Sequence, residues 1–130
     1  SHQFEVTVTN DGSPVENIGQ QLVHHVDVSE NDLAELVASE SPFKLLGYKT
    51  LILRDSNDQV TGILLNLRAE NDKTVKFGFQ HGDLIIGVEG TLVKSETDAN
   101  AIFAQLKSKR NLSVSIQRDG VPHKVIFYLG

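Results

Sequence analysis

The chain has 130 residues, 39% of them hydrophobic, and a formal charge of −5, which is the profile of one compact domain. The absence of cysteine excludes a disulfide framework, thiolate metal sites and a cysteine nucleophile. The longest apolar runs, such as residues 125–129, are far shorter than the roughly 20 residues that a membrane-spanning helix needs. We therefore expect no membrane span within this chain.

Charge is distributed unevenly along the chain. Residues 1–43 contain acidic side chains but no Lys or Arg, whereas residues 44–130 hold all twelve basic residues. The acidic part is either a solvated segment or a surface that docks on a basic partner or on the chain's own basic part. Because the basic residues are scattered and not interleaved with aromatic ones, we expect no nucleic-acid binding.

The first half of the chain predicts strands and one helix. Residues 4–8 alternate between apolar and polar side chains, and residues 22–28 are again strand-like, so we expect two short strands before the main fold. Ser29 and Asp32 form a capping pattern for a helix over residues 30–39, which Pro42 ends. Residues 48–54 and 60–67 then read as a hairpin joined by a polar loop.

The second half predicts a helix between strands. Residues 68–77 are charged and contain at most a short helical turn, and residues 84–89 form a buried strand that Gly90 breaks. Ser95 caps an amphipathic helix that extends to about Ser108. The chain closes with a hairpin that turns at Asp119-Gly120.

Motifs for catalysis and for metal binding are missing. There is no G-x-S-x-G motif and no Gly-rich phosphate cradle. His24 and His25 are consecutive in a predicted strand, so their side chains point to opposite faces and cannot chelate one ion together. The loop over residues 55–59 lacks the Gly and Glu of a calcium loop. We expect no enzymatic activity, no metal and no cofactor; the alternative is a site assembled from residues distant in the sequence.

The stretch from Gly78 to Gly90 has the pattern G-φ-x-x-G-D-φ-I, and a strand, Arg118-Asp119-Gly120 and a second strand follow it. This order of elements resembles a bacterial PDZ domain. We expect positive φ angles at Gly78 and Gly82, and Asp83 should accept backbone amides at the turn. The resemblance implies an α+β, PDZ-like fold: a partly open antiparallel β-barrel or sandwich, capped by two helices, with the bacterial-type strand order.

Among PDZ families, the chain is most similar to the PDZ domain of the type II secretion inner-membrane component C. The likeness covers residues 29–130 and leaves residues 1–28 as an N-terminal extension. It is carried by the Ser-initiated helix over 29–37, Leu45-Leu46, Val60-Thr61-Gly62 and the Arg-Asp-Gly hairpin. The chain departs from the family pattern at Arg54-Asp55, which lacks a following Gly, and at Asn66-Leu67-Arg68, where Asn-Pro-Gly is usual.

This likeness implies a non-catalytic module that binds an extended peptide or protein segment by strand addition. The implied partners are the outer-membrane secretin or a secreted protein, and the implied location is the periplasm, with an inner-membrane tether outside this chain. The alternative is the regulatory PDZ domain of an envelope protease, because Leu46-Gly47-Tyr48 resembles the carboxylate loop of those modules. In either case the groove residues would be Leu46, Gly47, Tyr48, Lys49, Thr50, Leu51, Leu53, Ala99, Phe103 and Leu106, of which Ala99, Phe103 and Leu106 also read as core.

Overall fold

The computed structural model of the chain describes residues 6–8 and 22–130. Its helices are α1 (Glu30–Val37), α2 (Pro42–Leu45) and α3 (Glu96–Lys109). Its strands are β1 (Val6–Val8), β2 (Leu22–Val28), β3 (Tyr48–Arg54), β4 (Val60–Leu67), β5 (Leu84–Val88), β6 (Thr91–Leu92), β7 (Asn111–Arg118) and β8 (Val121–Leu129). No helix in these residues is long and apolar enough to cross a bilayer.

Local sequence signals place most of these elements where they were expected. Ser29 Oγ accepts a hydrogen bond from the Asp32 amide at 3.1 Å, and Ser95 Oγ accepts one from the Asp98 amide at 3.0 Å, so both predicted helix caps are confirmed. Helix α2 and strand β6 were not expected, because they are too short to show a periodic pattern. Pro42 follows the end of α1, as expected. It is also the first residue of α2, because proline suits the first position of a helix.

The strands form one open, mixed sheet in the order β1-β2-β8-β7-β5-β4-β3, with β6 paired to β5. The antiparallel pairing expected within residues 29–130 is confirmed for β3 to β8. The sheet as a whole is mixed, because β1 and β2 of the N-terminal extension add to it in parallel, β1 along β2 and β2 along β8. Strands β2 and β8 are far apart in the sequence and are not joined by a tight turn, so nothing constrains them to run in opposite directions. The α+β, PDZ-like, partly open architecture itself is confirmed, with α2 as a helix beyond the two expected.

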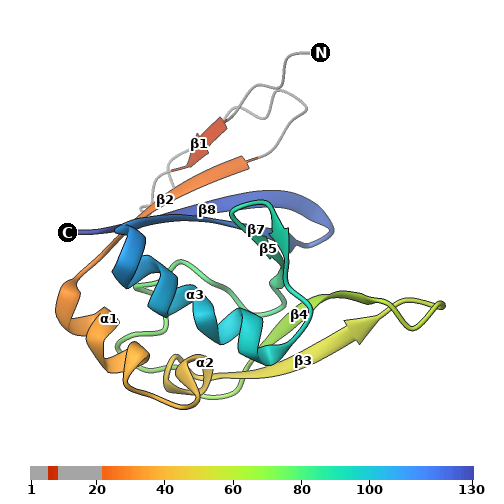
Figure 1. Cartoon of the computed structure of the whole chain (residues 1–130), viewed down its shortest axis with the longest axis horizontal. Coiled ribbons are helices and arrows are strands. Elements are labelled where there is room, and N and C mark those ends of the chain that lie inside the picture. The colour runs from red at the N-terminus through yellow and green to blue at the C-terminus, as the bar shows by residue number, and fades with distance from the viewer. Residues whose placement is uncertain (1–5, 9–21) are drawn as a thin grey trace.

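The core lies between the sheet and the helices. In Figure 1, α1, α2 and α3 gather beneath β8, while the β3–β4 hairpin projects away from them. A chain of aromatic contacts, with ring centroids 5.1–6.3 Å apart, runs through this space and joins Phe43, Phe77, Phe79, Phe103 and Phe127. The apolar stripe of α3 packs against these rings, so the burial of this helix holds the two layers together.

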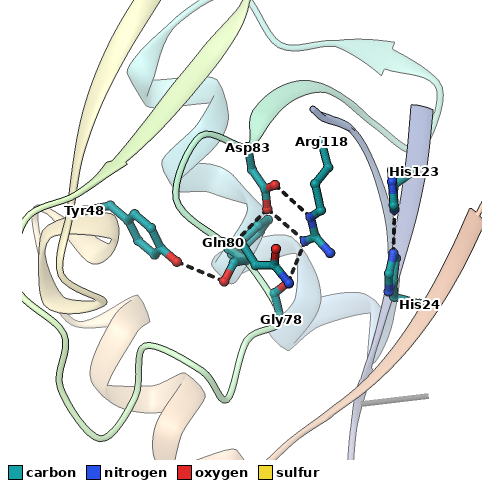
Figure 2. Close-up of polar contacts among 8 residues, drawn as sticks. His24, Tyr48, Gly78, Gln80, Asp83, Arg118 and His123 are labelled. Carbon is teal, nitrogen blue, oxygen red and sulfur yellow. Dashed lines mark hydrogen bonds and ion pairs between the residues drawn. The ribbon is translucent and has the colours of Figure 1, made fainter. Parts of the chain in front are cut away.

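The loop before β5 is built around a buried ion pair (Figure 2). Gly78 and Gly82 have the positive φ angles expected of them, 72° and 86°. Asp83 is fully buried, and its Oδ2 accepts from the Gln80 amide at 2.8 Å, as the motif predicts. The Arg118 guanidinium donates to both Asp83 oxygens at 2.9 Å and to the Gly78 carbonyl at 2.9 Å. The stretch from Gly78 to Gly90 and the Arg118-Asp119-Gly120 turn, which together carry the resemblance to PDZ domains, are therefore joined directly.

A histidine pair links β2 to β8 beside Arg118 (Figure 2). His24 Nε2 and His123 Nδ1 lie 2.7 Å apart, while the neighbouring His25 contacts Tyr128 Oη at 2.8 Å. The two consecutive histidines thus have different partners, as opposite orientations on a strand require. Burial, followed by the charge of Arg118, lowers the pKa of His24 to about 4, and the same two causes lower the pKa of His123.

The burial of Leu106 on α3 leads to a prediction for stability. Leu106 is 1% exposed, so the Leu106→Ala substitution should lower the free energy of unfolding by about 2–5 kcal/mol through lost burial and the cavity left behind. Lys107→Ala, at the exposed neighbouring position, is the matched control and should change it by less than about 0.5 kcal/mol. Denaturant unfolding measures both. Equal midpoints for the two variants would show that α3 does not pack as described.

The histidine pair leads to a prediction about pH. In the unfolded chain the pKa of His24 returns to 6.5, so between pH 6.5 and about 4 the unfolded state binds the proton that the folded state excludes. The stability contribution of the neutral pair is therefore complete above pH 6.5 and is lost as pH falls toward 4. Urea unfolding across this range should give a shallower decline for His24→Gln, and shallower still with His123→Gln added. A slope unchanged from wild type in the double variant would contradict this.

Candidate functional site

The candidate site is a pocket of about 660 Å³ between α2, the start of β3 and the first turns of α3. Its volume is in the range of known ligand pockets. Each of the three elements contributes side chains, and the loop after β4 closes the remaining side. The lining residues are Ser41, Phe43, Lys44, Gly47, Tyr48, Lys49, Thr50, Arg68, Ala69, Glu96 and Asn100.

Strand β3 forms one wall and is also the last strand of the sheet. Its partner among the described residues is β4, so its other edge is open. Leu65 of β4 lies opposite Thr50, and its backbone amide and carbonyl bond to Asp83 and Gly82, both at 2.8 Å. Because these groups point away from β3, Thr50 belongs to a pair that exchanges no hydrogen bonds, and its own amide and carbonyl face the open edge. By the same alternation, the backbone amide and carbonyl of Ile52 also face the open edge.

The turn that leads into β3 is fixed by backbone geometry. Gly47 has a φ of 95°, and a Cβ at this position would collide with the Ala69 carbonyl oxygen, so the turn requires glycine. The amides of Leu45, Leu46 and Gly47 donate to carbonyls of residues 41, 42 and 44 at 2.9–3.2 Å. In this conformation none of these three amides is free to meet a ligand carboxylate.

Two contacts position the walls of the pocket. The Tyr48 hydroxyl donates to the Phe79 carbonyl at 2.9 Å, which ties the start of β3 to the loop that contains Asp83 (Figure 2). Burial raises the pKa of Tyr48 to about 12, so this hydroxyl remains a donor at neutral pH. Across the pocket, Thr50 Oγ1 donates to Glu96 Oε1 at 3.0 Å and joins β3 to the first turn of α3.

The structure brings together part of the set of residues predicted for the groove. Gly47, Tyr48, Lys49 and Thr50 line the pocket, and Leu46 is buried beneath it. Leu51 and Leu53 lie on the face of β3 opposite to Thr50, because side chains alternate along a strand. The three predicted helix residues are buried in the core at 0–1% exposure: Ala99, Phe103 and Leu106.

Several of the lining residues were not predicted from the sequence. On α3, the pocket meets Glu96 and Asn100, which are polar and therefore lie outside the apolar stripe. Lys44 and Arg68 were also missed. Two signals could have indicated them: Lys44 is the first basic residue after the long acidic stretch, and Arg68 stands where the family pattern usually has Gly.

Comparison with known proteins finds similarity through the structure. No family model and no curated protein matches the chain. Among solved structures, the PDZ domain of EpsC from Vibrio cholerae is similar at a TM-score of 0.50 and 18% identity, over 75% of this chain and 92% of that one.

Two further solved structures show weaker likeness. The PDZ domain of the pullulanase C protein of the type II secretion system from Klebsiella pneumoniae, solved with a fatty acid, has a TM-score of 0.48 and 21% identity, over 75% of this chain and 99% of that one. The HtrA3 PDZ domain bound to a phage-derived ligand has a TM-score of 0.40 and 22% identity, over 62% of this chain and 86% of that one.

These identities are low, so the likeness to EpsC bears on the fold and not on the ligand. It agrees with the buried Asp83–Arg118 pair, which joins the two sequence motifs that carried the resemblance. It also agrees with the open, mixed sheet and its edge strand β3. The chain therefore has the fold of a PDZ domain, and its resemblance to the PDZ domain of the type II secretion component C is confirmed at the level of that fold.

Proposed function

We propose that the chain is a non-catalytic module that binds an extended segment of another protein at the open edge of β3. The observation that carries this proposal is the orientation of the Thr50 and Ile52 backbone groups, which face that edge beside the pocket. An added strand would complete their hydrogen bonds, and its side chains would enter the space between β3 and α3. PDZ domains are binding modules, so the fold supports this role.

We further propose that this module is the periplasmic part of a type II secretion inner-membrane component, tethered by a segment outside this chain. Its partners would be the secretin or exported proteins. The likeness of the fold to EpsC supports this assignment. In the same proposal, residues 29–130 form the PDZ-like domain and residues 1–28 an extension, although β2 of the extension pairs with β8 along its whole length.

A single proline can test strand addition. Ile52→Pro removes an amide that faces the open edge, while the hydrogen bonds between β3 and β4 remain. Binding of peptides selected on the wild-type chain from a random library should become about tenfold weaker or more, because a main-chain hydrogen bond is lost and the ring occupies its place. Fluorescence polarisation with the labelled peptides measures the affinity.

Two controls accompany this variant. Ile52→Ala keeps the backbone amide and should bind the peptides better than Ile52→Pro, which separates loss of the amide from loss of the side chain. Leu51→Pro removes an amide directed at β4 and should lower stability more than Ile52→Pro does, as a denaturant midpoint shows. Wild-type affinity in a folded Ile52→Pro protein would exclude strand addition at β3.

A further inference from the structure

The pocket is bordered by basic side chains that have no ionic partner. Lys44, Lys49 and Arg68 are exposed, and the part of the chain that the structure describes gives none of them an ion pair. Five other basic residues are each paired with a carboxylate: Arg54 with Asp58, Lys73 with Glu35, Lys76 with Asp32, Arg110 with Glu30, and Arg118 with Asp83. Lys94, Lys107 and Lys109 also have no ion pair among the described residues, but they do not line the pocket. Three basic side chains without an ion pair are therefore gathered around the opening of the pocket.

One carboxylate, Glu96, also lines the pocket, and it already accepts a hydrogen bond from Thr50. Three basic residues against one acidic residue leave an excess of positive charge along the path of an added strand. Such an excess favours an anionic ligand and raises its rate of association. It also disfavours a basic ligand, since like charges placed side by side repel.

The backbone hydrogen bonds of residues 45–47 indicate whether the ligand's negative charge comes from a terminal carboxylate or from acidic side chains. The amides of residues 45–47 are all used inside α2 and its turn, so among the amides of the carboxylate-loop sequence only that of Tyr48, which faces the open edge by the same alternation as Thr50, is left for a terminal carboxylate. Carboxylates would instead be met by the long side chains of Lys44, Lys49 and Arg68. Side chains reach carboxylates at any point of an extended segment, so a free C-terminus is not required.

Resting on the proposed function, we infer that the segment added at β3 is an acidic internal stretch of a partner protein, with acidic and apolar residues in alternation. Its acidic side chains lie near Lys44, Lys49 and Arg68. Its apolar side chains lie beside Ile52, which is 39% exposed at the open edge. Alternation follows from strand geometry, because successive side chains of the added strand point to opposite faces.

The test uses four short peptides and the whole chain labelled with ¹⁵N. Three peptides have blocked ends and alternate Val with Asp, Asn or Lys; the fourth is the Asn peptide with a free C-terminal carboxylate. The blocked Asp peptide should bind most tightly and shift the amide signals of Thr50, Ile52 and Asn100. Its affinity should fall as salt is raised, because exposed charges are screened.

Charge-removing variants locate the interaction. Lys49→Gln and Arg68→Gln should each weaken binding of the Asp peptide by about two- to fivefold, the size expected of an exposed ion pair, and leave the Asn peptide unaffected. Lys109→Gln is the matched control, because Lys109 ends α3 about 20 Å along the helix from Glu96 and should not alter binding.

The outcomes separate this inference from the function on which it rests. Equal binding of the three blocked peptides at β3 would keep strand addition and overturn the preference for acidic segments. Binding of the free-carboxylate peptide alone would overturn the internal mode. Asp-peptide binding that Lys109→Gln abolishes and Arg68→Gln does not would place the ligand elsewhere and also overturn it. Absence of binding by all four peptides, together with failure of library selection, would overturn the proposed function itself.

Discussion

The buried pair of Asp83 and Arg118 is the interaction on which the proposed binding edge depends. A carboxylate with no exposed surface is tolerated only when it is paired and hydrogen-bonded, and Asp83 meets both conditions through Arg118 and the Gln80 amide. This fixes the loop in front of β5, which then bonds to both backbone groups of Leu65. Because Leu65 is engaged on that side, the facing backbone of Thr50 is left for the open edge of β3. The ion pair thereby supports the geometry in which the Thr50 backbone faces the open edge, where strand addition is proposed.

Charge is arranged to leave the pocket basic. The acidic first part of the chain is partly neutralised by the second part, since Glu30, Asp32 and Glu35 of α1 contact Arg110, Lys76 and Lys73. Each of these surface pairs adds little to stability. Their effect is on distribution: the acidic side chains of α1 are engaged with distant basic residues, and the basic residues around the pocket are not. The net charge of −5 therefore conceals a positive surface where binding is proposed.

The sequence predicted what local periodicity and capping determine. Alternation gave β2, β3 and β4 with the bounds that the structure has, and the two serine caps gave the starts of α1 and α3. It could not give the partner of Asp83, because the two residues of that pair are 35 positions apart.

The helix residues that line the pocket were not indicated by the sequence for a related reason. Apolar spacing on α3 marks the stripe that enters the core, whereas the pocket meets the polar flank at Glu96 and Asn100, which has no periodic signal. The proposed binding surface of α3 lies at the margin of its apolar stripe, so the pattern that predicts the helix does not indicate the residues that line the pocket. The basic residues of the pocket come from three separate segments, and only the fold unites them.

The response to pH and the proposed binding site lie at different sides of the sheet. The histidine pair joins β2 to β8, whereas β3 is the last strand at the opposite side of the strand order. Within the pocket, burial raises the pKa of Tyr48 to about 12, so its bond to Phe79 persists from neutral to acidic pH. Acidification from pH 6.5 toward pH 4 therefore lowers the stability that the histidine pair contributes, while it leaves the Tyr48 wall of the pocket unchanged. A fall in stability over that range need not reduce the affinity of the folded protein, because His24 and His123 do not line the pocket.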